Sequence, residues 1–164
     1  MHIRPATAAD SAAIAAIYND AITSSTATFD TEPKTPEDRA AWLTEHRERH
    51  PVLVAEKDGR VVGWGACSTW SDRCAYDATV ELSVYVDPDE HRHGVGRTLS
   101  RELIGLAPAL GIHSIIGRIC TENTASLALA ETLGFSLVGV MHEVGRKFGR
   151  WLDVAIWELL IDAE

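Results

Sequence analysis

Three extended segments follow one another with no helix between them, and this run is the feature that most restricts the fold. They read "VLVAEKD", "VVGWGACSTW" and "TVELSVYV", and the Asp58-Gly59 pair between the first two supplies the positive φ angles of a tight hairpin turn. Parallel strands need long crossover connections, which these short links do not provide. The sequence therefore predicts an antiparallel meander and disfavours a Rossmann fold.

The remaining elements flank this meander. An edge strand is expected at 2–6, because Pro5 cannot donate to a ladder on both sides, and apolar residues at helical spacing follow from Asp10. Thr35 caps a second helix that we expect to run through His50. Later segments predict a helix ending at 108–111, a strand at 113–119, a helix at 123–134 and strands at 136–144 and 151–161. The order β-α-α-β-β-β-α-β-α-β-β predicts an α/β (α+β) fold around one mixed sheet.

Composition and charge narrow the class of protein. The 164 residues, 46% of them hydrophobic, predict one domain over residues 1–164, and the net charge of -9 argues against binding to nucleic acid or anionic membranes. The three cysteines, Cys67, Cys74 and Cys120, lack CxxC spacing, so neither a disulfide framework nor a zinc site is expected. No apolar run approaches the ~20 residues of a membrane span, and no signal peptide opens the chain. We expect a cytoplasmic protein.

A basic, glycine-bearing turn between residues 87 and 97 leads directly into a helix. Gly94 and Gly96 allow close approach of the backbone, and Arg92 and Arg97 add positive charge. Free N–H groups at a helix N-terminus bind phosphate, although such a turn also occurs for purely structural reasons. The segment lacks the GKS or GKT of a P-loop and the third glycine of a dinucleotide fingerprint. No further ligand is spaced to complete a metal site with its histidines, so no metal is expected.

The same turn carries a resemblance to a known family. "HRHGVGRTL" after "LSVYV" resembles the acetyl-CoA pyrophosphate loop of GNAT acetyltransferases, with His91 where the family has Gln or Arg. The segments "IYNDAITSSTATFDTEP", "TVELSVYVDP", "ENTASLALAETLGF" and "GRKFGRWLDVAIWEL" are similar to the phosphinothricin and methionine sulfoximine N-acetyltransferases. Those enzymes acetylate the amino group of small amino-acid-like substrates.

The resemblance implies a fold and a co-substrate. It implies a mixed, mostly antiparallel sheet that splays open between its fourth and fifth strands, and a homodimer. Acetyl-CoA would be the co-substrate, with its pantetheine arm pairing with the strand backbone at Val84 and Val86. The residues that the resemblance assigns to acetyl-CoA are Val84, Tyr85, Val86, Arg92, His93, Gly94, Val95, Gly96, Arg97 and Asn123. Asn123 is equally suited to be a simple helix N-cap.

Transfer of an acetyl group to an amine requires a base, because the amine is mostly protonated near neutral pH. Strand alternation in "TVELSVYV" places Glu81, Ser83 and Tyr85 on one face. From the pattern alone Glu81 faces either solvent or a site; the resemblance implies that it is the general base, acting directly or through water. The family's usual tyrosine acid is replaced by Ala130, and Tyr85 either substitutes for it or packs on the sheet.

The resemblance also implies a substrate pocket. Arg73 lies eight residues before the expected base, the spacing found in phosphinothricin acetyltransferases, and arginine suits bidentate recognition of a carboxylate. Phe29 and Tyr76 would form pocket walls. The methionine sulfoximine branch places its arginine two residues earlier, where this chain has Ser71.

Three hypotheses about function follow. The first is an acetyl-CoA-dependent N-acetyltransferase that acts on a small amino acid or analogue by direct transfer in a ternary complex. The second is the same chemistry on a protein N-terminus or a polyamine, which the acidic composition favours. The third is a non-catalytic module that binds acyl-CoA, favoured by the missing tyrosine.

Overall fold

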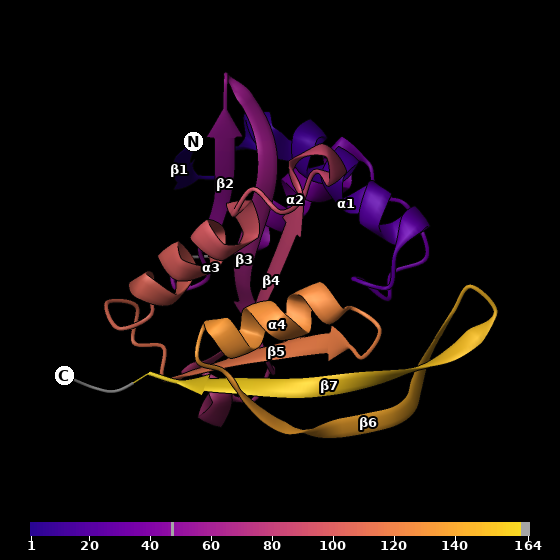
Figure 1. The fold of residues 1–164 in the computed structure, drawn as a ribbon. Coiled ribbons are helices and arrows are strands. Elements are labelled where there is room, and N and C mark those ends of the chain that lie inside the picture. Colours follow the sequence, from indigo (N-terminus) through magenta and orange to yellow (C-terminus); the bar gives the residue numbers. More distant parts are fainter. Residues whose placement is uncertain (47, 162–164) are drawn as a thin grey trace.

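The computed structural model describes residues 1–46 and 48–161 and has the predicted order of elements (Figure 1). Short 3-10 turns lie at Ala8–Asp10, Cys74–Tyr76 and Pro88–Glu90. The strands and helices are β1 (His2–Pro5), α1 (Ser11–Ser24), α2 (Pro36–Glu45), β2 (Val52–Lys57), β3 (Arg60–Thr69), β4 (Thr79–Val86), α3 (Val95–Leu106), β5 (Ser114–Cys120), α4 (Thr124–Thr132), β6 (Ser136–Lys147) and β7 (Arg150–Leu160).

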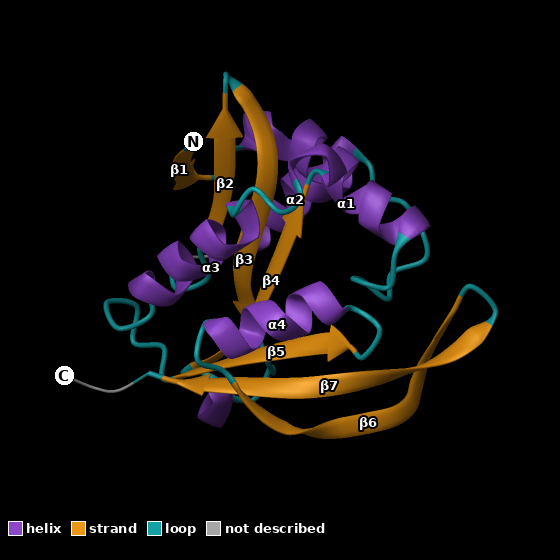
Figure 2. Cartoon of the chain, in the orientation of Figure 1, coloured by secondary structure: helices purple, strands orange, loops and turns teal. Residues whose placement is uncertain are grey.

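One seven-stranded sheet connects all the strands in the order β1-β2-β3-β4-β5-β7-β6. Every neighbouring pair is antiparallel except β4 and β5, whose parallel pairing is limited to Thr79–Glu81 against Ser114–Ile116. Beyond Glu81 the two strands diverge, and Figure 2 shows β5, β7 and β6 running across the direction of β2, β3 and β4. The predicted mixed sheet, its edge strand β1 and its splay between the fourth and fifth strands are confirmed.

Helices cover both faces of the sheet, and strand alternation decides which residues meet them. On one face, Leu99 and Leu103 of α3 pack with Val80, and Leu82, Val84 and Val86 lie against the same core. On the other face α1 and α2 cover an aromatic cluster. The residues of this cluster are Tyr18, Trp42, Trp64 and Tyr85. The predicted two-faced character of β4 is therefore confirmed, and no helix in the described part of the chain is long and apolar enough to cross a membrane.

Two boundaries differ from the sequence prediction. Helix α2 ends at Glu45 rather than at His50, because His46 is extended and its imidazole contacts the Trp42 carbonyl and the Ser68 hydroxyl. Strand β6 continues to Lys147, so the segment 145–150 is not a loop. The turn to β7 consists only of Phe148 and Gly149, both with positive φ. An aromatic residue seldom adopts this conformation, which is why the sequence did not indicate a two-residue turn.

The start of α1 contains a buried ion pair that makes stability depend on pH. The Asp10 carboxylate is 6% exposed and accepts two hydrogen bonds of 2.9 Å from Arg4 and one from Thr7 N–H. Arg4 is the main cause that lowers the pKa of Asp10 from 3.8 to about 2. A carboxyl group whose pKa is lower in the folded state than in the unfolded state stabilises the fold at pH values above the unfolded-state pKa. This stabilisation is lost as the pH falls through the folded-state pKa.

We therefore expect Asp10→Asn to lower the free energy of unfolding at pH 7 by about 2 kcal/mol. The difference between variant and parent should shrink between pH 4 and pH 2, as measured by urea denaturation at several pH values. Asp72→Asn on an exposed loop is the control and should stay within about 0.5 kcal/mol of the parent. A penalty for Asp10→Asn that is the same at pH 2 and pH 7 would contradict this assignment.

Candidate active site

The divergence of β4 and β5 opens a cleft of about 1160 Å³. Its walls come from both separated strands, at Leu82–Val86 and at Gly117–Cys120. The end of α1 with the loop that follows it, the N-terminus of α3, and α4 complete the lining. A deep groove between separated strands exposes strand backbone that an extended ligand can pair with. The cleft is thus suited to a long ligand with one end at α3 and the other at the splay point.

A backbone cradle forms the α3 end of the cleft. Gly94 is the N-cap of α3 with φ +81°, and Arg92 also has a positive φ of 65°. Within the described residues, the backbone N–H groups of residues 92–97 make no hydrogen bond. These free donors and the positive end of the helix dipole suit a diphosphate. Arg92, Gly94, Val95, Gly96 and Arg97 all line the cleft, so the cradle fits the diphosphate of CoA.

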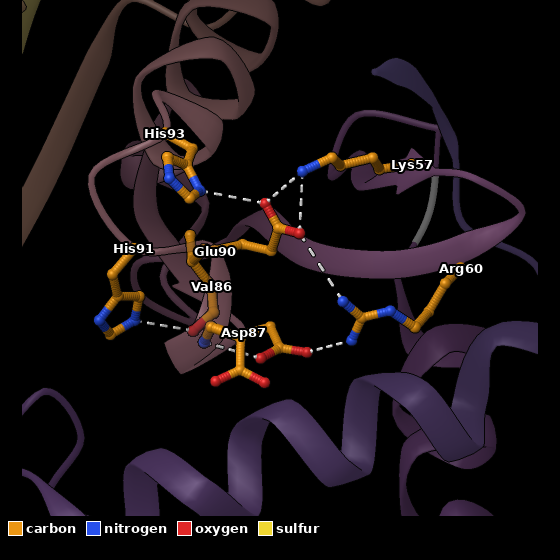
Figure 3. A network of polar contacts seen from close by, with 8 residues as sticks. Lys57, Arg60, Val86, Asp87, Glu90, His91 and His93 are labelled. Atoms are coloured by element: carbon orange, nitrogen blue, oxygen red, sulfur yellow. Dashed lines mark hydrogen bonds and ion pairs between the residues drawn. The ribbon is translucent and has the colours of Figure 1, made fainter.

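A charged network holds the base of this cradle (Figure 3). Glu90 is buried, and both of its carboxylate oxygens accept hydrogen bonds from Lys57 Nζ, at 2.9 and 3.0 Å. Arg60 donates to Asp87 at 2.6 Å and lies 3.7 Å from Glu90, while His93 Nδ1 is 3.3 Å from the same carboxylate. His93 is therefore directed toward the supporting network, and it is not among the residues that line the cleft. The network ties the loop to the β2–β3 hairpin.

His91, the residue that departs from the family pattern, lines the cleft and contacts the end of β4. Its Nε2 donates a hydrogen bond of 3.0 Å to the Val86 carbonyl (Figure 3). The family's glutamine or arginine position is thus occupied by a side chain that joins the loop to the strand. Val84 and Val86 both border the cleft, and their pairing with a pantetheine arm stays a prediction.

Glu81 lies at the point where β4 and β5 separate, and it is held by an arginine. Arg118 donates from Nε and Nη2 to the two Glu81 carboxylate oxygens, both at 2.7 Å. This contact raises the pKa of the Arg118 guanidinium. Arg118 lines the cleft, whereas Glu81, 18% exposed, lies behind it. This arrangement allows a substrate amine to meet Glu81 beside Arg118 or through a bridging water.

Tyr85 is four residues further along the same face, roughly 13 Å from Glu81 in strand rise. Its ring packs edge-on against Tyr18 and lies 4.9 Å from Trp64, centroid to centroid. Burial raises the pKa of its phenol, so the hydroxyl stays protonated and can donate a hydrogen bond. Tyr85 thus packs on the sheet and also lines the cleft, and its role as the general acid stays a prediction.

Of the other predicted residues, Asn123 reaches the cleft and three do not. Asn123 Oδ1 caps α4 by accepting from Ser126 N–H at 3.2 Å. The Phe29 ring packs where a Cβ at Gly145 would be. Arg73 and Tyr76 lie on an exposed loop, and neither is among the cleft residues. Their contacts with a substrate stay predictions.

Two side chains that matter for the cleft were not singled out from the sequence. Arg118 lies in a segment predicted only as a buried strand, although a charged residue within "SIIGRIC" is a signal that one side of the strand is open. Lys147 is 4% exposed and donates to the Ser25 and Thr28 carbonyls at 2.7 and 2.8 Å. It thereby fixes the loop after α1, part of which lines the cleft. Among the described residues no group of three or more His, Cys, Asp or Glu side chains is arranged to hold a metal ion.

Comparison with known sequences assigns the chain to a family. Residues 3–156 match the family model described as acetyltransferase (GNAT) domain. The chain is 42% identical over 158 residues to the phosphinothricin N-acetyltransferase of Streptomyces viridochromogenes, covering 96% of this chain and 86% of that protein. It is 41% identical over 162 residues to the L-methionine sulfoximine/L-methionine sulfone acetyltransferase of Pseudomonas aeruginosa, covering 98% and 94%.

Solved structures agree with this assignment. The putative acetyltransferase yncA of Salmonella typhimurium, solved with its cofactor acetyl-CoA, superposes with a TM-score of 0.96 at 38% identity over 100% of this chain and 95% of that one. A phosphinothricin acetyltransferase of Sinorhizobium meliloti in complex with acetyl-CoA gives a TM-score of 0.94 at 34% identity, covering 98% and 88%. With its splayed sheet and its cradle at the start of α3, the chain belongs to the GNAT acetyltransferase family.

Proposed function

We propose that this chain is one domain that transfers the acetyl group of acetyl-CoA to the amino group of a small amino acid or analogue, such as phosphinothricin or methionine sulfoximine. The observation that carries the proposal is the cleft, which joins a cradle of free N–H groups at one end to the Glu81–Arg118 pair at the other. The residues proposed to hold acetyl-CoA are Val84, Tyr85, Val86, Arg92, His93, Gly94, Val95, Gly96, Arg97 and Asn123, with His93 acting from behind the loop.

The proposed reaction is a direct transfer in a ternary complex. Glu81 removes one proton from the substrate ammonium, directly or through a water, and passes it to solvent. The neutral nitrogen then attacks the thioester carbonyl carbon, so that a C–N bond forms and the C–S bond breaks. The second proton leaves the nitrogen, and the departing thiolate is protonated by Tyr85 or by solvent. Phe29, Arg73 and Tyr76 remain predicted substrate contacts, and the last two are exposed.

A thiol-release assay with acetyl-CoA tests the proposal. The amine panel contains phosphinothricin, methionine sulfoximine, several amino acids, a polyamine and a peptide with a free N-terminus. Release with the amino acids or their analogues, above that with the polyamine and the peptide, is the expected result. Faster thiol release with the polyamine or the peptide would show that the enzyme acetylates another class of amine. Binding of acetyl-CoA without thiol release for any amine would favour the non-catalytic module.

We further propose that the protein acts in the cytoplasm as a homodimer. Strand β6 is an edge strand with exposed apolar side chains on most of its length, including Leu137, Val138 and Val144, and Trp151 of β7 is 59% exposed. An exposed apolar edge of this kind is usually covered by another chain. Light scattering after size exclusion tests the proposal, and a monomeric mass at micromolar concentration would contradict it.

A further inference from the structure

Arg118 occupies a special position in the sheet. The last parallel pair between β4 and β5 joins Glu81 to Ile116, so Arg118 is the first residue beyond it on the Glu81 side of β5. Its side chain bridges the start of the gap, from the separated strand β5 back to the strand that carries the expected base. The guanidinium also lies over the Trp70 ring, with 5.7 Å between its central carbon and the ring centroid. Two different contacts thus fix its direction.

The guanidinium retains hydrogen-bonding capacity on the side of the cleft. Of its five N–H donors, one on Nε and one on Nη2 bind Glu81. Within the described residues, Nη1 makes no hydrogen bond, and the side chain is 52% exposed where it lines the cleft. The edge formed by Nη1 and Nη2 is therefore available to a carboxylate, in the bidentate geometry for which guanidinium is suited.

Other arginines are placed less favourably for the acceptor substrate. Arg73 lies outside the cleft, and Arg92 and Arg97 belong to the cradle at the far end. Arg150 lines the cleft but donates to Glu122 at 2.7 Å. It is also remote from the expected base, because the residue of β7 that pairs with Arg118 is Ile156, six positions further along the strand. Arg118 is the one cleft-lining arginine of the described residues that touches Glu81. An amine at Glu81 therefore has this cation as its immediate neighbour.

A fixed cation beside the base discriminates among amines. It repels a second ammonium group, as in a polyamine, and it forms no ion pair with the neutral amide that follows a peptide N-terminus, whose carbonyl oxygen accepts only an ordinary hydrogen bond. An α-amino acid, in contrast, carries a carboxylate one carbon away from its amine. Its two charges match the order of charges in the site, with the ammonium toward Glu81 and the carboxylate toward Arg118.

We propose that Arg118 is the specificity-determining residue that binds the α-carboxylate of the acceptor through its Nη1–Nη2 edge while it remains paired with Glu81. The inference rests on the proposed acetyltransferase function and replaces Arg73 by Arg118 as the carboxylate anchor. It restricts the acceptors to amines with an adjacent carboxylate. The same contact orients the amine toward the base.

The test compares two acceptors in the thiol-release assay, L-methionine sulfoximine and its α-carboxamide, with the full-length protein. The parent enzyme should prefer the acid in kcat/KM. Because a hydrogen bond between charged groups is lost, Arg118→Ala should lower the ratio of kcat/KM for acid over amide by about 10- to 100-fold. Arg118→Lys should restore part of the ratio, since a point charge replaces the bidentate edge. The Arg118 side chain is 52% exposed and lines the cleft rather than the core, so both variants should keep the parent's circular dichroism spectrum.

Matched variants separate Arg118 from the competing arginines. Arg150→Ala should leave the ratio of acid over amide within about threefold of the parent value, and Arg73→Ala, at the carboxylate anchor expected from the sequence, should lower this ratio less than Arg118→Ala does. A collapse of the ratio in Arg73→Ala, with an unchanged ratio in Arg118→Ala, would overturn the inference in favour of Arg73. Equal rates for acid and amide in the parent would also overturn it, while the acetyltransferase function would stand. Transfer to neither acceptor, nor to any other amine of the panel, would reject the proposed function and the inference with it.

Discussion

Glu81→Gln is expected to lower kcat by about 10²- to 10³-fold, because the amide cannot accept the proton that the substrate ammonium must lose. Glutamine has nearly the same shape as glutamate, and its amide oxygen can still accept one of the two hydrogen bonds from Arg118. The affinity for acetyl-CoA should remain close to that of the parent, since Glu81 is not part of the cleft lining. Steady-state kinetics and equilibrium binding of CoA measure the two effects separately.

The variant also predicts a change in pH dependence. If the lost group is the base, raising the pH supplies more neutral amine and should recover part of the lost rate in Glu81→Gln. Glu122→Gln is the matched control, because Glu122 also accepts a 2.7 Å hydrogen bond from an arginine at the cleft. This control should keep kcat within about threefold of the parent. Full activity of Glu81→Gln across the pH range would remove Glu81 as the base.

The fold was predictable because it depends on local patterns. Alternation in "TVELSVYV" decides which side chains meet α3 and which meet the aromatic cluster, and Asp58-Gly59 both take the positive φ angles of the hairpin turn. The cradle was predictable for the same reason, since Gly94 has the left-handed conformation that its residue type favours. These features depend on a few neighbouring residues, which the sequence displays directly.

The contacts that set the chemistry were not predictable in the same way. Arg118 and Glu81 are 37 residues apart, and Lys147 contacts residues 119 and 122 positions away. Whether Arg118 reaches Glu81 depends on the register of a parallel pair only three residues long. A shift of one residue would turn Arg118 to the other face of the sheet. The charge of Glu81 and the alternation along its strand indicate that this carboxylate needs a partner, but they do not identify Arg118 as that partner.

Lys147→Met is expected to lower the free energy of unfolding by about 3 kcal/mol. Burial lowers the pKa of the Lys147 ammonium, and its two hydrogen bonds to the Ser25 and Thr28 carbonyls offset the cost of burying the charge. Methionine fills a similar volume but leaves both carbonyls without this donor, at about 1–3 kcal/mol for each unsatisfied group. Urea denaturation at pH 7 measures the loss.

Lys147→Met should also alter the cleft, because Ser25 lines the cleft and its carbonyl is one of the two that Lys147 binds. Without the ammonium, amide hydrogen exchange in residues 25–29 should become faster, and KM for the acceptor should rise more than kcat falls. Arg146→Met is the matched control, since Arg146 is the adjacent residue of β6, is exposed and stacks on Trp151. In the Arg146→Met variant, the exchange rates of residues 25–29 should equal those of the parent.

The contradicting result would be a Lys147→Met variant that loses stability but keeps the parent's exchange rates in this loop and the parent's KM. Lys147 would then stabilise only the β6–β7 hairpin. The loop after α1 would be positioned by its own contacts, such as the hydrogen bond between Tyr18 and Asp30.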